Sequence, residues 1–221
     1  MVYSYSSVAT FRQCPAKFNY AYNLKVKVDK QPPSPAMERG SRIHDSIEAY
    51  LLKTNEFMHP DIHANYGQWM MGIRESGAEV LPEFKWGITW EMKPCAYDDP
   101  ACMIHGFVDL LVIPEDENAN LDLYEWKTGG IYPEHVTQIH KYSVAMMCHY
   151  PERPGVDAMV TYLDKQDYKA VHYPKTMMFE YKPMLRSEIG NIADATRFPT
   201  MPSFKCRWCQ FSRDNGGPCK F

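Results

Sequence analysis

The chain has 221 residues, of which 45% are hydrophobic and 23% are charged, and its formal net charge is −3. This composition fits one domain with a substantial core and excludes wholesale disorder. It lacks the strongly basic balance of many nucleic-acid binders, although local patches and bound cations can still set the field at one site. No stretch has the pattern of a signal peptide or a membrane span, so we expect an intracellular protein whose cysteines are reduced or metal-bound.

The first third of the chain predicts helices. Ser4 or Ser6 can cap the first helical stretch, in which Pro15 ends one helix or opens the next. The stretch from Gln31 to Ala36 holds three prolines and predicts a loop. Apolar residues at helical spacing mark a second helix, and a third follows with a weaker pattern. The expected helices are 4–23, 37–54 and 61–82.

The pattern then changes to short apolar runs that predict strands, with a polar turn from Glu115 to Asn120. Pro133 opens another helix, and prolines with paired glycines predict irregular structure from Phe198 onward. This order predicts an α/β fold with a mixed central sheet flanked by helices. The expected strands are 86–93, 103–113, 120–127, 156–164 and 169–174, and the expected helices are 133–149 and 183–196.

Two of the expected strands carry acidic side chains in apolar surroundings. Asp109 lies in such a strand, where an ionised carboxylate is costly to bury unless a charge or a metal compensates it. Glu125 and Lys127 are two residues apart on the next strand, so they point to the same face. The two carboxylates can converge on one hard cation such as Mg²⁺. The alternatives are an aspartate that faces solvent and a solvated ion pair at a strand end.

Two helices offer further polar groups. His44 lies one turn after Gly40, whose missing side chain lets a backbone or a phosphate approach closely. Gln138 and Tyr142 are four residues apart and present an amide and a hydroxyl on one helix face. A lone histidine on a helix is more often structural, and each signal is weak by itself. Because these helices and the two acidic strands occur together along the chain, we interpret their polar residues as one candidate site.

These blocks resemble the RecB-type branch of the PD-(D/E)XK nuclease superfamily, and the likeness covers nearly the whole chain. The chain is particularly similar to compact iron–sulfur nucleases related to the AddB nuclease domain and to CRISPR-adaptation exonucleases. The resemblance implies a restriction-endonuclease-like core in a single domain over 1–221. The matching motifs are G-x-x-x-H at Gly40–His44, G-x-x-D at Gly106–Asp109, (D/E)-x-K at Glu125–Lys127 and Q-x-x-x-Y at Gln138–Tyr142.

The resemblance also implies a ligand set. His44, Asp109, Glu125 and the backbone carbonyl of Trp126 would ligate Mg²⁺ or Mn²⁺. Lys127 would orient the attacking water and help to deprotonate it. A bound cation can polarise the phosphoryl oxygen and lower the pKa of water, so this set is chemically coherent.

Three more residues complete the expected site. Gln138 and Tyr142 would hold Lys127 or the DNA backbone, and Glu91 would be a supporting carboxylate. The implied function is a metal-dependent DNA exonuclease acting at single-stranded or free ends in recombination, repair or DNA turnover. Such an enzyme would work in the bacterial cytoplasm or a virus-infected cell, alongside recombination or replication proteins. The alternative is a non-catalytic or zinc-stabilised DNA-binding module of the same fold within a larger complex.

Three of the seven cysteines lie near the end of the sequence. Cys206 and Cys209 form a C-x-x-C pair, which places two thiolates for one metal centre, and Cys219 follows. Cys14 can supply the fourth ligand. The resembled subfamily uses this layout to hold a [4Fe–4S] cluster. The long gap before Cys219 has the composition of a turn insertion, so a Cys₄ zinc site and unliganded thiols are the alternatives.

The cluster would fasten residues 1–30 to residues 198–221, which makes the tail a cysteine-rich, metal-bound segment. Phe204, Trp208 and Phe211 are interleaved with basic residues in this tail, a pattern that suits a single DNA strand. The alternative is that these aromatic side chains wrap the metal site. The remaining cysteines are interpreted as ordinary core residues: Cys95, Cys102 and Cys148.

Overall fold

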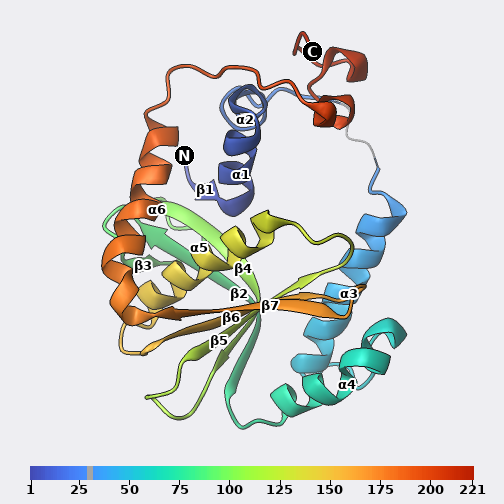
Figure 1. Ribbon diagram of the computed structural model, residues 1–221, viewed down its shortest axis with the longest axis vertical. Coiled ribbons are helices and arrows are strands. Elements are labelled where there is room, and N and C mark those ends of the chain that lie inside the picture. Colours follow the sequence, from blue (N-terminus) through green and yellow to red (C-terminus); the bar gives the residue numbers. More distant parts are fainter. Residues whose placement is uncertain (29–31) are drawn as a thin grey trace.

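The computed structural model describes residues 1–28 and 32–221 (Figure 1). Residues 29 and 30 of the expected metal-binding segment and Gln31 of the expected loop lie outside the described residues. A seven-stranded mixed sheet has the order β3-β2-β4-β5-β6-β7, and β1 pairs with β4. The strands are β1 (Tyr3–Ser4), β2 (Glu79–Thr89), β3 (Pro94–Cys95), β4 (Cys102–Ile113), β5 (Leu121–Lys127), β6 (Gly155–Tyr162) and β7 (Asp167–Pro174).

Prolines occupy the first turn of four helices, where the missing N–H would have had no partner within the helix. Ser4 and Ser34 cap α1 and α3 through their side-chain oxygens. In the part of the chain that the structure describes, none of the helices is long and apolar enough to cross a membrane. The helices are α1 (Tyr5–Gln13), α2 (Pro15–Phe18), α3 (Pro35–Leu51), α4 (Pro60–Arg74), α5 (Pro133–His149) and α6 (Met178–Ala193). Shorter helical turns are Asn19–Asn23, Lys175–Met177, Phe204–Trp208 and Arg213–Asn215.

The sheet separates two apolar cores. The larger core joins α1, α5 and α6 to one face, while the smaller one joins α3 and α4 to the other face. Figure 1 shows α5 with α6 on the left and α3 with α4 on the right. Strand β4 pairs antiparallel with both β2 and β5. Strands β5 and β6 pair parallel and are connected along the chain by α5. Strand β7 then pairs antiparallel with β6. The predicted mixed sheet with flanking helices is therefore confirmed.

Two different strands, β1 and β5, pair with the same edge of β4. Tyr3 and Ser4 of β1 pair with Ile104 and His105, and β5 pairs with Leu110–Val112. The other edge of β4 is covered by β2. Within the described residues, 106–109 have no strand partner on the edge shared by β1 and β5, so β4 and β5 diverge there. Asp109 lies in this fork.

Several predicted boundaries are wrong, and α3 begins at Pro35, within the loop expected from Gln31 to Ala36. The helix expected over 61–82 ends at Arg74, and the strand expected over 86–93 is instead β2, which ends at Thr89. Residues 79–82 pair with 110–113 of β4, and this long-range pairing overrides a weak helical pattern. Helix α6 begins at Met178, five residues before the predicted start, and contains Pro183. Helix α5 has the predicted bounds.

Candidate active site

Asp109 bridges the two strands of the fork. Its Oδ2 accepts a hydrogen bond from the backbone N–H of Trp126 on β5 at 2.6 Å. The side chain is 12% exposed, and burial raises the pKa of Asp109 to about 7 although the charge of Lys127 opposes the shift. The carboxylate therefore lies where no ladder bond forms, in a position to receive a cation.

Glu125 is buried on β5 and points toward α5. Its Oε1 accepts hydrogen bonds from Lys127 Nζ at 2.6 Å and from Gln138 Nε2 at 2.8 Å. Its Oε2 is buried without a hydrogen-bond partner among the described residues. Burial, reinforced by the charge of Asp109, raises the pKa of Glu125 to about 7. A buried carboxylate oxygen without a partner is costly, and a bound cation would remove that cost.

Lys127 carries the compensating positive charge. Burial opposes its charged form, but the carboxylates of Glu125 and Asp109 outweigh burial and raise the pKa of Lys127. Gln138 donates its second amide hydrogen bond to the Tyr142 hydroxyl at 2.9 Å. In place of the expected contact with Lys127, Gln138 donates to Glu125, and the side chains of Gln138 and Tyr142 are both buried. A contact of these side chains with the DNA backbone stays a prediction.

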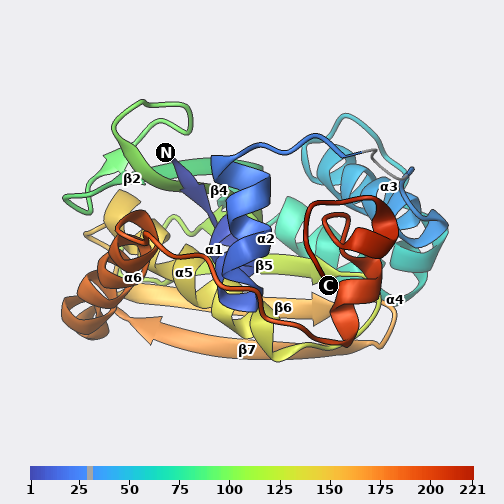
Figure 2. The same ribbon diagram turned by 90° about the horizontal axis from the view of Figure 1, so that it is seen from above.

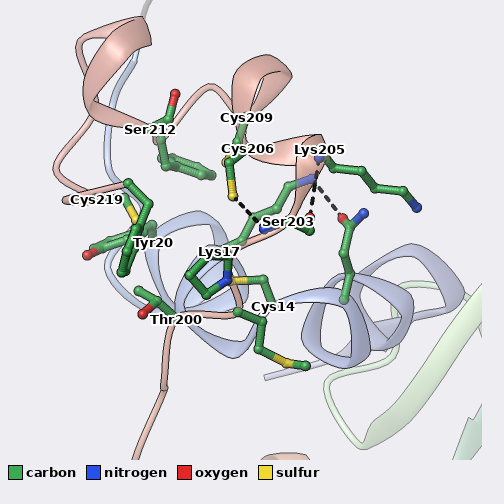
Figure 3. A pocket seen from close by; sticks show the side chains of 15 residues that line it. Cys14, Lys17, Tyr20, Thr200, Ser203, Lys205, Cys206, Cys209, Ser212 and Cys219 are labelled. Atoms are coloured by element: carbon green, nitrogen blue, oxygen red, sulfur yellow. Dashed lines mark hydrogen bonds between the residues drawn. The ribbon is translucent and has the colours of Figure 1, made fainter.

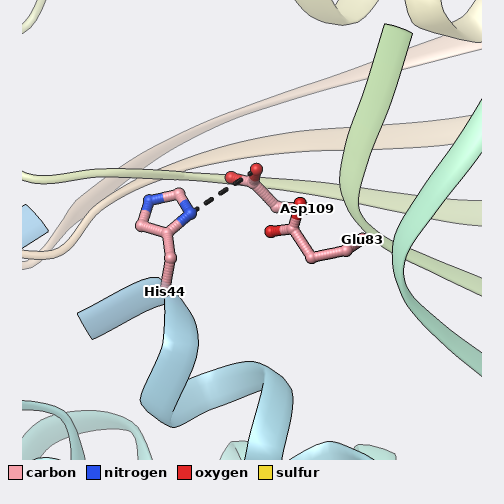
Figure 4. A group of neighbouring side chains, drawn as sticks. All are labelled: His44, Glu83 and Asp109. Atoms are coloured by element: carbon pink, nitrogen blue, oxygen red, sulfur yellow. Dashed lines mark ion pairs between the residues drawn. The ribbon is translucent and has the colours of Figure 1, made fainter. Parts of the chain in front are cut away.

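A second group of ligand atoms meets Asp109 from two other elements. One ligand atom each from His44, Glu83 and Asp109 lies within 4.8 Å of the others (Figure 4). His44 Nδ1 is 3.6 Å from Asp109 Oδ1. Burial lowers the pKa of His44, although Glu125, Glu83 and the backbone of Trp126 oppose the shift. A neutral imidazole has a lone pair free for a metal.

Glu83 was missed by the sequence analysis, which named Glu91. Pro82 pairs with Leu110 and Phe84 with Val108, so the register places Glu83 opposite Asp109. Its φ of +48° is in the left-handed region, which is strained for glutamate and is often found at functional sites. Glu91 instead lies exposed in the turn after β2. The helix expected over 61–82 covers the first residues of β2, so the strand pattern before Trp86 is the signal that could have revealed Glu83.

Two motif glycines make room for neighbouring groups. A Cβ on Gly40 would lie 3.0 Å from Thr128 Oγ1, so glycine allows α3 to approach the loop after β5. A Cβ on Gly106 would lie 2.7 Å from the buried Trp86 ring. A cleft beside α3 has a volume of about 610 Å³, and its lining includes Gly40, His44 and Glu83.

The four predicted cysteine ligands line one pocket between the α1–α2 region and the tail (Figure 3). They are Cys14, Cys206, Cys209 and Cys219. The insertion before Cys219 is a turn that ends with Gly216 at φ +78°. Asn215 donates to the Cys209 carbonyl at 3.0 Å, and the Cys219 N–H donates to the Phe211 carbonyl at 2.9 Å. The turn therefore returns Cys219 to the pocket.

No three of these four described cysteines have sulfurs within 4.8 Å of one another, whereas a tetrahedral zinc site holds its sulfurs about 3.8 Å apart. The Ser203 N–H donates to Cys206 Sγ at 3.3 Å. Of the other cysteines, Cys102 and Cys148 are buried and Cys95 is half-buried. Burial raises the pKa of Cys95 to about 12, so its thiol is protonated.

Comparison with known proteins identifies one family. The family model described as the PD-(D/E)XK nuclease superfamily matches residues 2–213. Among solved structures, that of SSO0001 is similar with a TM-score of 0.49 and 13% identity, over 93% of this chain and 82% of that chain. No curated protein matches the chain. Because that structural likeness is weak, the assignment rests on the family match.

Proposed function

The chain belongs to the PD-(D/E)XK nuclease superfamily, and from this premise we propose that it is a DNA exonuclease acting at single-stranded or free ends. Members of the superfamily are metal-dependent nucleases, so membership implies phosphodiester hydrolysis with a divalent cation. Recombination, repair or DNA turnover would be the process it serves. The four motif blocks, all filled and in family order, favour an enzyme over a non-catalytic module.

The observation that carries this proposal is the buried pair Asp109 and Glu125. Both carboxyl groups have a pKa raised to about 7 by burial, and Glu125 Oε2 has no partner among the described residues. Lys127 supplies only one positive charge against these two carboxylates. The pair therefore keeps an excess negative charge that a divalent cation would offset, and such a cation would also bind the free oxygen.

His44, Asp109 and Glu83 supply ligand atoms within 4.8 Å of one another, and Glu125 lies outside this group. The proposed ligands are these three residues, with Glu125 and the carbonyl of Trp126 completing the set. When bound, the cation would neutralise phosphate charge and lower the pKa of a water molecule. A set that mixes imidazole nitrogen with carboxylate oxygens suits Mn²⁺ at least as well as Mg²⁺, because Mg²⁺ prefers oxygen ligands alone.

The protein side chains around this pair have separate roles. The raised pKa of Lys127 keeps its ammonium protonated, so it is better suited to orient the attacking water than to remove its proton. Gln138 fixes Glu125 through Oε1 and thereby leaves Oε2 for the cation. Tyr142 accepts the other amide hydrogen bond of Gln138 and so fixes the orientation of that amide.

We also propose that the cysteine pocket holds a [4Fe–4S] cluster. Each thiolate of such a cluster binds a different iron atom, so the four sulfurs stand farther apart than around one zinc ion. The proposal is supported by the four cysteines lining one pocket. The N–H donated to Cys206 Sγ is the kind of contact that tunes a thiolate ligand.

The proposed function is tested by digesting end-labelled single- and double-stranded DNA with Mg²⁺, Mn²⁺ or EDTA. We expect metal-dependent release of label from the end, and a loss of about 100-fold or more in Lys127→Ala, a loss typical of removing one preorganised donor at the reacting groups. Lys169→Ala, at an exposed position of β7, is the matched control. Cleavage in EDTA, or near-normal cleavage by Lys127→Ala, would contradict the mechanism. DNA binding without cleavage under any metal would favour the non-catalytic module.

A further inference from the structure

The helical turn Phe204–Trp208 presents two large aromatic side chains to solvent. Phe204 is 70% exposed and Trp208 is 64% exposed. Their rings meet edge to face with centroids 6.1 Å apart, and the Arg207 guanidinium lies 3.8 Å from the Trp208 ring centroid. Phe211, by contrast, is buried and lines the cysteine pocket. Packing around the cysteines therefore accounts for Phe211, and it leaves the two exposed rings unexplained.

The charge around these two rings is positive. From Phe204 to the last residue the sequence holds four basic side chains and one acidic side chain, Asp214, in a chain whose net charge is −3. The basic character is therefore local and complements a polyanion. The basic residues are Lys205, Arg207, Arg213 and Lys220.

The same segment borders a cavity between α1 and α5. Lys205 lines this cavity of about 350 Å³ together with Arg12 of α1 and Thr137 of α5. Tyr5 also lines it, and its ring centroid is 6.3 Å from that of Tyr142. Through Gln138, Tyr142 is linked to Glu125. Tyr5, in the wall of this cavity, is thus connected to the buried Glu125 through Tyr142 and Gln138.

We propose that Phe204 and Trp208 form a stacking platform for the bases of single-stranded DNA. Lys205 and Arg207 would contact the phosphates, and the strand would continue past Lys205 along the cavity between α1 and α5. Every base has a π-face, so stacking with electrostatic attraction holds a strand without reading its sequence. Duplex bases are already stacked on each other, so the platform selects single strands. Cleavage of the bound strand rests on the proposed function, whereas binding of the strand to the platform does not.

The test measures binding of the full chain to fluorescent oligothymidylate of about 12 nucleotides in EDTA, by anisotropy. A duplex and an abasic strand of the same length serve as comparison ligands. The double variant Phe204→Ala, Trp208→Ala should bind oligothymidylate about tenfold more weakly or worse, because each lost stack weakens binding severalfold. Its affinity for the abasic strand should change less than about twofold. The matched control replaces Phe57 and Phe179, which are 80% and 75% exposed elsewhere, and should bind normally.

Several outcomes would overturn the platform. Unchanged oligothymidylate affinity in the double variant would do so, as would an equal loss for the abasic strand. Loss of binding to phosphatidylserine vesicles with normal DNA binding would assign the rings to a membrane surface. Trp208→Phe keeps a ring and should restore most of the affinity, which separates stacking from misfolding. Stacking-dependent binding without cleavage would contradict the proposed function and leave the platform intact.

Discussion

At the scale of single residues, the negative charges of Asp109 and Glu125 are incompletely compensated in the metal-free site. Asp109 has the Trp126 N–H, and Glu125 has Lys127 and Gln138, yet burial still raises the pKa of both carboxyl groups. The folded apo protein therefore disfavours their ionised forms at neutral pH. A cation that binds only the folded state would remove this penalty, so metal binding and stability should be coupled.

We predict that Asp109→Asn stabilises the metal-free protein at high pH only. The pKa of Asp109 is raised from 3.8 to about 7, so its favourable contribution is complete below the unfolded value and is lost as the pH rises toward 7. Near pH 8 in EDTA the variant should exceed wild type by roughly 2 kcal/mol or more, at about 1.4 kcal/mol per pKa unit. Near pH 4 the two should be equal. The surrounding titratable groups remain in both proteins: Glu83 on β2, Glu125 and Lys127 on β5, and His44 on α3.

The measurement is the free energy of unfolding from urea titrations at both pH values. Adding Mn²⁺ near pH 8 should raise the stability of wild type more than that of Asp109→Asn. A variant less stable than wild type in EDTA near pH 8 would show that the aspartate is not destabilised by burial. Normal DNA cleavage by this variant would remove Asp109 from the site.

Glu83 and Glu91 form a matched pair for a second prediction. Glu83→Gln keeps the size of the side chain but removes the charge facing His44 and Asp109, so the apparent Mn²⁺ affinity should fall roughly tenfold or more. Glu91→Gln alters an exposed turn and should bind Mn²⁺ normally. Isothermal titration calorimetry with both variants checks this. Equal affinities would show that Glu83 has no part in metal binding.

At the scale of elements, the fork between β4 and β5 depends on how the strands and α5 pack behind it. Trp86 is fully buried and meets Tyr142 edge to face, with ring centroids 5.5 Å apart. Gly106 gives the Trp86 ring the room it needs. The glycine of the G-x-x-D motif therefore acts at a distance: it seats Trp86, which packs against Tyr142, which in turn positions Gln138.

We predict that Gly106→Ala destabilises the protein. Its Cβ would lie 2.7 Å from Trp86, and overpacking of this kind costs about 1–3 kcal/mol. For a chain of this length each kcal/mol lowers the Tm by about 2–4 °C. Gly72→Ala in α4 meets nothing within 4 Å and should be neutral or slightly stabilising. Equal thermal unfolding curves for Gly106→Ala and wild type would show that the ring moves freely.

In the candidate site, the sequence draws attention to those residues that carry their own local signal. Asp109 and Glu125 stand out as carboxylates in apolar strands, and their predicted strands lie within one residue of β4 and β5. Glu83 has no such signal, because only the register with β4 places it opposite Asp109. The hydrogen-bond partner of Gln138 could not be predicted either, because a side chain on that helix face can contact either Lys127 or Glu125. Long-range pairing and side-chain rotation thus set the limit of what could be predicted.

At the scale of the whole molecule, the cysteine pocket brings the first helices against the tail. Figure 2 shows the end of the chain beside α2. The Ala16 N–H donates to the Pro199 carbonyl at 3.1 Å, and Phe18 stacks on Phe198. A metal cluster bound at Cys14 and in the tail would close a loop of roughly 200 residues, and long closures restrict the unfolded chain most.

We therefore predict that Cys14, Cys206, Cys209 and Cys219 bind one [4Fe–4S] cluster. Anaerobically purified protein should be brown and contain iron and sulfide, and alanine at any of the four should bleach it and lower the Tm, because binding energy at such a site is also folding energy. As controls, alanine at Cys95, Cys102 or Cys148 should leave the colour intact. A colourless, active protein with one zinc per chain would instead establish the Cys₄ zinc site. Intact colour in Cys14→Ala would mean that the fourth ligand lies elsewhere and that the cluster does not join the two ends of the fold.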